Sequence, residues 1–170
     1  MQTILKPGND FRPQMGRILK LLLADEYRLY KITYDYHWNI TEPDYDTLRL
    51  LFHLQHEEAS RWVDSVAEWM RALDLGILIN WAELGESARC ATASGQGLPA
   101  QRMLAELLRS HEEIIEQLYI DSNICRHDLG DDSMAVLLTR LREEHESAAW
   151  MVRAQLGTSW EQCLSDPLSA

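Results

Sequence analysis

The 170-residue chain has few cysteines, a deficit of basic residues and no long apolar run. Its three cysteines are odd in number and contain no CxxC pair, which excludes a disulfide scaffold and indicates a reducing compartment. Sixteen Lys and Arg against 27 Asp and Glu give a net charge of −11, which disfavours a general role on nucleic acids or anionic membranes. The longest aliphatic run near the N-terminus, Leu21–Ala24, is too short to cross a bilayer. We therefore expect a cytoplasmic protein without a membrane segment.

Strand-type alternation is also missing, whereas apolar residues recur at helical steps of three and four along most of the chain. This pattern predicts four helices: from about Pro13 to Tyr36, from the capping segment Thr41–Asp44 to a stop at Gly76, from Met103 to near His127, and from Met134 to a stop at Gly157. Glycine, serine and threonine break the pattern between the second and third helices. That connection has room for one short helix around residues 80–88.

Four helices joined by a short first loop, a long central connection and a short last turn have ferritin-like connectivity. The predicted fold class is therefore all-α: a ferritin-like four-helix bundle over residues 13–157, with a long crossover that carries a short extra helix. Residues 1–12 and 158–170 are expected to form short tails. Neither tail contains a cluster of basic residues suited to DNA binding.

A di-iron site inside such a bundle requires a Glu-x-x-His motif on each of two helices, and the chain has none. A polar stripe on the second predicted helix is a better candidate for chemistry. Its members share one helix face: Arg49, His53, His56, Glu57, Ser60, Asp64 and Glu68. The stripe is either a solvated face with local ion pairs or a metal site, in which Asp64 and Glu68, one turn apart, share a cation.

Nitrogen ligands for Asp64 and Glu68 cannot come from the same chain. His53 precedes Asp64 by eleven residues, which span about 16 Å along a helix. His37 lies in the turn region before that helix and is no nearer. If two copies of the second helix met antiparallel across a two-fold axis, His37 and His53 of one chain would lie beside the carboxylates of the other.

Two groups of residues carry a family resemblance. The run Tyr36-His37-Trp38-Asn39, followed by Asp64-Ser65-Val66-Ala67-Glu68, resembles the Dps family of mini-ferritins, and the segment from Gly130 to Ala154 is similar to the last helix of that family. The resemblance covers most of residues 15–157. It implies a homo-oligomer, a hollow dodecamer, with ferroxidase centres at two-fold interfaces between subunits.

The resemblance also implies an activity and a ligand set. His37, Asp64 and Glu68 would bind iron, and Trp38 would lie beside the centre. The protein would be a ferroxidase that oxidises Fe(II), with hydrogen peroxide as the family's preferred oxidant. It would store Fe(III) inside the shell and protect against oxidative stress.

Two positions depart from the family pattern. Arg49 stands where the family usually has a second histidine, and His53 stands where it usually has an aspartate. A guanidinium group cannot bind a cation, whereas an imidazole binds iron or zinc. We therefore expect His37, His53, Asp64 and Glu68 as metal ligands, with zinc able to occupy the same centre.

A third acidic group, Asp128, Asp131 and Asp132, lies between the last two predicted helices. Taken alone, these residues indicate a turn and a helix N-cap. By resemblance they lie near cation pores on the three-fold axes of the shell. Two other functions stay open: a nucleoid DNA-binding protein, which the net charge argues against, and a zinc-binding shell without turnover.

Overall fold

The computed structural model describes residues 11–41, 45–77, 86–89 and 97–157. These residues form α1 (Arg12–Asn39), α2 (Tyr45–Ala72), α4 (Ala100–Asn123), the π-helical turn η1 (Ile124–Asp128) and α5 (Asp132–Leu156). No strand occurs in the described ranges, and the predicted all-α fold is confirmed. The predicted short helix lies mostly outside these ranges, as do both predicted tails; of that helix, Glu86 and Ser87 are described and helical.

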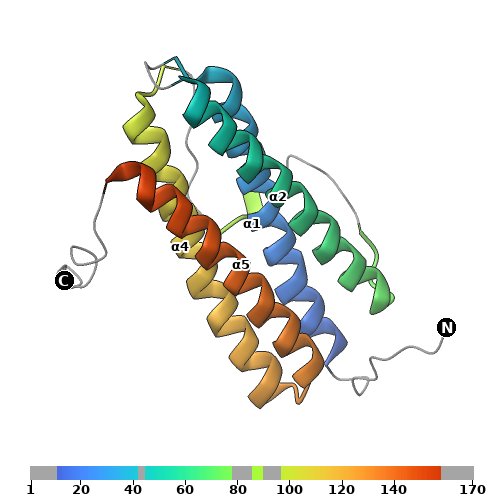
Figure 1. The fold of residues 1–170 in the computed structure, drawn as a ribbon. Helices are drawn as coiled ribbons and strands as arrows, with labels where there is room; N and C mark the ends of the chain where they lie inside the picture. The colour runs from blue at the N-terminus through green and yellow to red at the C-terminus, as the bar shows by residue number, and fades with distance from the viewer. Residues whose placement is uncertain (1–10, 42–44, 78–85, 90–96, 158–170) are drawn as a thin grey trace.

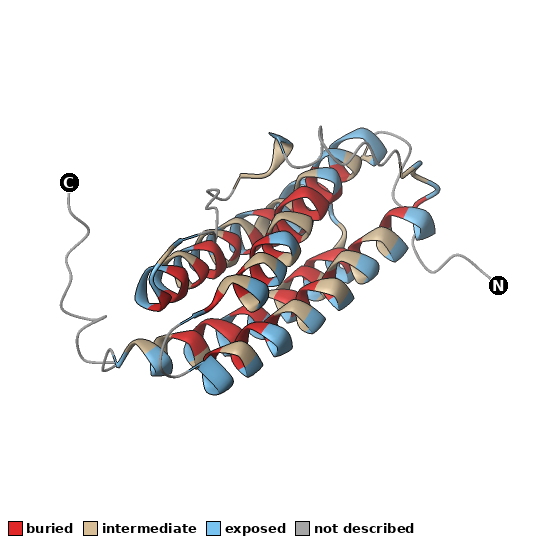
Figure 2. Ribbon diagram, turned by 90° about the horizontal axis from the view of Figure 1, so that it is seen from above, coloured by how far each residue is buried: buried red, intermediate tan, exposed pale blue. Residues whose placement is uncertain are grey.

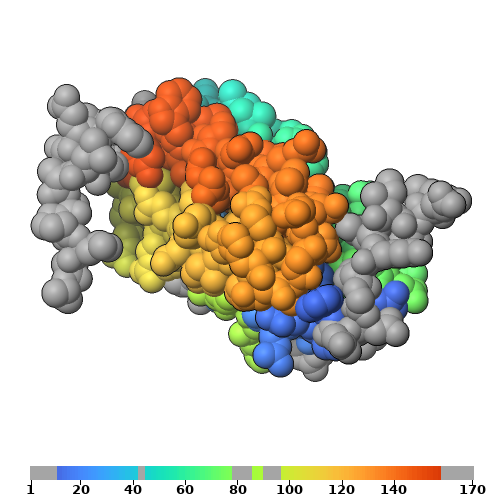
Figure 3. Space-filling model, turned by 90° about the horizontal axis from the view of Figure 1, so that it is seen from below, coloured from blue at the N-terminus to red at the C-terminus, as the bar shows by residue number. Residues whose placement is uncertain are grey.

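The four long helices form a bundle in which α1 pairs with α2 and α4 pairs with α5 (Figure 1). Each helix buries one face because its apolar residues recur at helical spacing. Figure 2 shows that these buried faces line the interior of the bundle. The largest fully buried side chains include Tyr36, Phe52, Leu107 and Met134, from all four helices. Figure 3 shows α4 and α5 side by side along one outer face.

The helix ends follow from local sequence chemistry. Pro13 stands in the first turn of α1, where a missing N–H costs no helical hydrogen bond. Asp131 caps α5, because its side chain accepts a hydrogen bond from the backbone N–H of Met134 at 2.9 Å. Gly157 ends α5 in the left-handed region, with φ of 68°. The predicted stop at Gly157 is therefore confirmed.

The end of the third predicted helix differs in detail from the expectation. Regular α-helix ends at Asn123, and residues 124–128 continue as a π-helical turn. Here the N–H of Leu129 donates to the carbonyl of Ile124 at 3.0 Å, and that of Asp131 donates to the carbonyl of Cys125 at 2.8 Å. Apolar periodicity does not distinguish this wider turn from the end of an α-helix.

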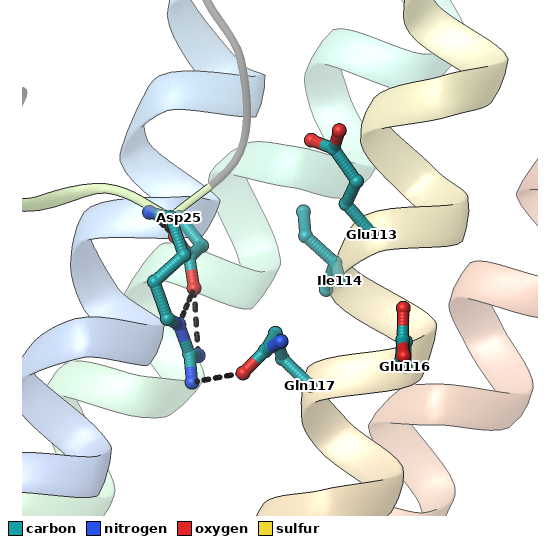
Figure 4. A pocket seen from close by; sticks show the side chains of 6 residues that line it. Asp25, Glu113, Ile114, Glu116 and Gln117 are labelled. Atoms are coloured by element: carbon teal, nitrogen blue, oxygen red, sulfur yellow. Dashed lines mark hydrogen bonds and ion pairs between the residues drawn. The ribbon is translucent and has the colours of Figure 1, made fainter. Parts of the chain in front are cut away.

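The long connection between α2 and α4 is fixed to the bundle at Arg89. Its guanidinium contacts the fully buried carboxylate of Asp25 on α1 and donates from Nη1 to Gln117 and Asp121 on α4. Figure 4 shows Asp25 and Gln117 around this group, beside a cavity of about 180 Å³. No described helix contains an apolar stretch that could span a bilayer.

Candidate metal site on α1 and α2

His37, near the end of α1, and His53, on α2, lie close together. Their ring centroids are 5.3 Å apart. Both rings line a cavity of about 340 Å³, together with Asp46, Arg49 and Leu50. The short connection between the two helices places the end of α1 beside the first turns of α2, and this brings the two imidazoles to one place.

His37 has a defined tautomer. Its Nδ1 lies 3.2 Å from the backbone carbonyl oxygen of Arg49. A carbonyl oxygen only accepts hydrogen bonds, so the ring hydrogen is assigned to Nδ1 and Nε2 keeps its lone pair. A metal-binding histidine is typically held in this way through its other nitrogen. The neutral ring of His37 therefore presents Nε2 as its ligand atom.

Arg49 is held beside the cavity by aromatic rings. Its guanidinium carbon lies 5.7 Å from the ring centroid of Trp38 and 5.6 Å from that of Tyr45. Trp38 is 61% exposed and packs edge-on against His37, with ring centroids 4.9 Å apart. These cation–π contacts keep a positive charge next to the two imidazoles.

A third histidine, His56, lies next to this pair. Its Nδ1 donates to the carbonyl oxygen of Tyr30 at 3.3 Å, and its ring contacts Tyr30 and Tyr34. Burial lowers the pKa of His56, and His53 and His37 lower it further against the opposing hydrogen bond to Tyr30. The sequence placed His56 on the polar stripe but gave no sign that tyrosine rings surround it.

Asp64 and Glu68 lie farther along α2, and both are exposed. Because α2 is one continuous helix, His53 and Asp64 are about 16 Å apart along its axis. In the described part of the single chain, no three His, Cys, Asp or Glu side chains are close enough to hold a metal ion. The chain therefore presents two separate half-sets of ligands: His37 with His53, and Asp64 with Glu68.

Local ion pairs form on and beside the polar stripe of α2. The Nε2 atom of His53 lies 3.5 Å from Oε1 of Glu57, and Arg61 contacts Glu58 at 3.6 Å. Both pairs are weak because at least one partner in each is well exposed. Neither Asp64 nor Glu68 takes part in an ion pair within the described ranges of this helix.

The acidic residues between α4 and α5 have local roles. Asp131 is the N-cap of α5, as the turn interpretation expected. Asp132 lies 3.8 Å from Arg126 through Oδ1 and Nε, and Asp128 is exposed at the end of η1. The single chain brings all three to one corner of the bundle, where η1 ends and α5 begins.

Comparisons with known proteins agree with the bundle fold. The family model "Ferritin-like domain" matches residues 17–159. An uncharacterized low temperature-induced protein of Nostoc sp. is 32% identical over 135 residues, covering 78% of this chain and 74% of the relative. A DNA protection during starvation protein of Brevibacillus brevis is 24% identical over 82% of this chain and 92% of its own. The crystal structure of Dps from Thermosynechococcus elongatus has a TM-score of 0.81 at 29% identity, covering 89% of this chain and 96% of that chain.

Proposed function

The chain belongs to the ferritin-like family, in its Dps branch, and we propose that it is the subunit of a mini-ferritin that oxidises Fe(II) between subunits and stores Fe(III) in a hollow shell. The observation that carries this proposal is the separation of two complementary half-sets along α2, the first of which also includes His37 of α1. His37 and His53 offer neutral nitrogen ligands at one end. Asp64 and Glu68 offer anionic oxygen ligands at the other, beyond the reach of the same chain.

A second copy of the chain would complete the site. Antiparallel contact of two α2 helices brings the histidines of one protomer to the carboxylates of its partner. Large apolar side chains flank the histidine half-set and are exposed in the single chain: Tyr34, Trp38, Tyr45, Leu50 and Leu54. An exposed apolar surface of this kind favours burial against another protein surface. The proposed assembly is a homo-oligomer, a dodecamer as in the family.

The residues of the proposed centre bind iron and supply charge, and none of them is proposed to react covalently. Asp64 and Glu68 favour Fe(III) over Fe(II), because anionic oxygen ligands stabilise the higher charge. With hydrogen peroxide, two Fe(II) ions give two electrons, the O–O bond breaks, and two protons complete two waters. Trp38 lies against His37 and is placed to give an electron to a stray oxidising equivalent. Asp128, Asp131 and Asp132 are proposed to line a cation entry in the shell.

Mixed shells test the intersubunit site most directly. His37→Ala and Asp64→Ala subunits are each expected to assemble and to be inactive alone. Dissociated and reassembled together, they form hybrid dimers in which one of the two centres keeps His37 from one chain and Asp64 from the other. Rapid Fe(II) oxidation recovered in the mixture supports the proposal. No recovery, with hybrid assembly verified by mass spectrometry, contradicts it.

A zinc-binding shell without turnover is a second candidate, and two observations favour it. His53 adds a second imidazole, which suits Zn(II) as well as Fe(II), and Arg49 adds a positive charge beside it. A shell that binds Zn(II) tightly but fails to oxidise Fe(II) after peroxide addition would establish this alternative. DNA binding is the least supported function, because the net charge is −11.

A further inference from the structure

Four polar side chains, one from each long helix, form a hydrogen-bonded chain in the centre of the bundle. Glu26 of α1, Gln55 of α2, His111 of α4 and His145 of α5 are all fully buried. Oε1 of Glu26 lies 3.0 Å from Nε2 of His145, and the Nδ1 atoms of the two histidines lie 3.1 Å apart. Nε2 of His111 lies 2.8 Å from Oε1 of Gln55. We call these residues the central tetrad.

The tetrad needs one hydrogen more than two neutral imidazoles, a carboxylate and an amide oxygen carry. Each of its three contacts requires a hydrogen between two heavy atoms, because facing lone pairs at these distances repel. Two neutral imidazoles bring one ring hydrogen each, while a carboxylate and an amide oxygen bring none. The third hydrogen must come from solvent. The count is the same whether that hydrogen resides on Glu26 or on His145.

The number of hydrogens that the tetrad needs depends on which amide atom of Gln55 faces His111. That orientation is assigned from the groups around the amide. With Nε2 towards His111, the amide would donate and both hydrogen bonds of His111 would reverse direction. No extra proton would then be needed, and the buried carboxylate of Glu26 would keep its charge without a counterion, at high cost. With Oε1 towards His111, as found, the additional proton neutralises Glu26.

The groups around the tetrad favour one positive charge and disfavour two. The ring of Trp62 on α2 lies against that of His145, with centroids 4.1 Å apart and planes tilted by 34°, and its Nε1–H donates to Glu144 of α5 at 2.6 Å. An indole face stabilises a neighbouring cation. Glu58 of α2 and Glu144 are the other charged groups interacting here. Burial and the nearby His145 lower the pKa of His111 well below its ordinary value.

We propose that the central tetrad is a proton-binding site, which takes up one proton when the chain folds and holds it as the internal counterion of Glu26. A second proton is disfavoured, because Nδ1 of His111 already accepts from His145 and protonation of the remaining free acceptor, Oε2 of Glu26, would leave a net positive charge in the core. The site is separate from the proposed iron centre and does not depend on it. It makes the stability of the bundle depend on pH in two ranges, which we call the acid limb and the alkaline limb.

The sign of each limb follows from the proton count. On the acid side, the unfolded chain protonates both histidines below their ordinary pKa of 6.5, while the folded tetrad holds one proton. The stability that the tetrad contributes is therefore greatest near pH 6.5 and is lost as the pH falls below that value. On the alkaline side, the folded tetrad keeps a proton that the unfolded chain has released. The equilibrium constant for folding then falls about tenfold for each unit by which the pH rises.

Neutron diffraction from deuterated crystals near neutral pD tests the site without any variant. We expect three deuterons on the three tetrad contacts, with Nδ1 of His111 bare. Deuterons on two ring nitrogens only, with the amide nitrogen of Gln55 facing His111, would overturn the proposal.

A pair of variants tests the alkaline limb. In Glu26→Gln no buried carboxylate needs a counterion, so the additional tenfold weakening per pH unit above pH 7.5 should disappear. The matched control is Glu112→Gln, whose carboxylate is half exposed and binds Arg153 on the surface; its slope should equal that of the wild type. Unfolding in urea at several pH values measures both. If the free energy of unfolding falls equally steeply with pH above pH 7.5 in the wild type and in Glu26→Gln, the proposal is overturned.

Discussion

Asp25 of α1 and Arg89 of the long connection form a buried ion pair. Nε of Arg89 lies 2.7 Å from Oδ2 of Asp25, and its backbone N–H donates to Oδ1 of the same carboxylate. Asp25 has no exposed surface. The same guanidinium also forms an ion pair with Asp121. Burial raises the pKa of Asp121, and the charge of Arg89 opposes part of that rise. One cation thus neutralises two carboxylates and ties the connection to α1 and α4.

Arg89→Ala is expected to destabilise the subunit strongly. The substitution removes the guanidinium that neutralises the buried carboxylate of Asp25, which costs about 3–5 kcal/mol. Arg102→Ala is the matched control, because the Arg102 side chain is largely exposed in its ion pair with Glu106, and ion pairs formed by an exposed side chain contribute less than about 1 kcal/mol. Urea unfolding measures both free energies. Similar small decreases in the free energy of unfolding in the two variants would mean that Arg89 does not hold the connection against the bundle.

The sequence predicted the four helices and their order because apolar periodicity and end signals are local. Pro13, Asp131 and Gly157 each mark an end that the structure confirms or supports. The ion pair of Arg89 was not predictable, because its partners are 64 and 32 residues away and no spacing rule links them. The π-helical turn was missed for the related reason that it changes hydrogen bonds without changing the apolar pattern.

The candidate site was predicted in part, because helical spacing is a local signal and contacts between helices are not. Helical spacing placed His53, Asp64 and Glu68 on one polar face of α2, and all three are exposed there. Their ligand roles remain predictions. Helical spacing places His145 among the apolar positions of α5, in agreement with its burial, but the contact with His111 joins two helices and leaves no local signal in the sequence.

Asp64→Ala combined with Glu68→Ala is expected to abolish rapid Fe(II) oxidation and to leave the shell assembled. Both side chains are exposed in the single chain, so their removal sacrifices little apolar burial. Glu112→Ala with Glu116→Ala is the matched control, an exposed i,i+4 pair on α4. Stopped-flow absorbance reports oxidation and size-exclusion chromatography reports assembly. Oxidation at the wild-type rate in the Asp64 and Glu68 variant would make these carboxylates part of a solvated face.

Cys125 is expected to be inert in the folded protein. Burial raises the pKa of its thiol to about 12, and the charges of Asp121 and Asp131 add to the shift. The nucleophile is the thiolate, which is scarce at pH 8 under these conditions. In a Cys90→Ser, Cys163→Ser background, iodoacetamide should label the unfolded chain and spare the native one. Native labelling as fast as that of the unfolded chain would contradict the assigned burial.

Arg49 and His53 should make the two metals of each centre unequal. The guanidinium of Arg49 lies beside the cavity and weakens binding of a second cation, whereas the imidazole of His53 strengthens binding of the first. Anaerobic titration of assembled shells with Zn(II) and with Fe(II) should therefore give one tight and one weak metal per centre. Arg49→Ala should tighten the weak site, and His53→Ala should weaken the tight one. His127→Ala, an exposed histidine in η1, should change neither. Two equally tight metals in the wild type would mean that Arg49 turns away from the centre on assembly, and unchanged Zn(II) affinity in His53→Ala would remove His53 from the ligand set.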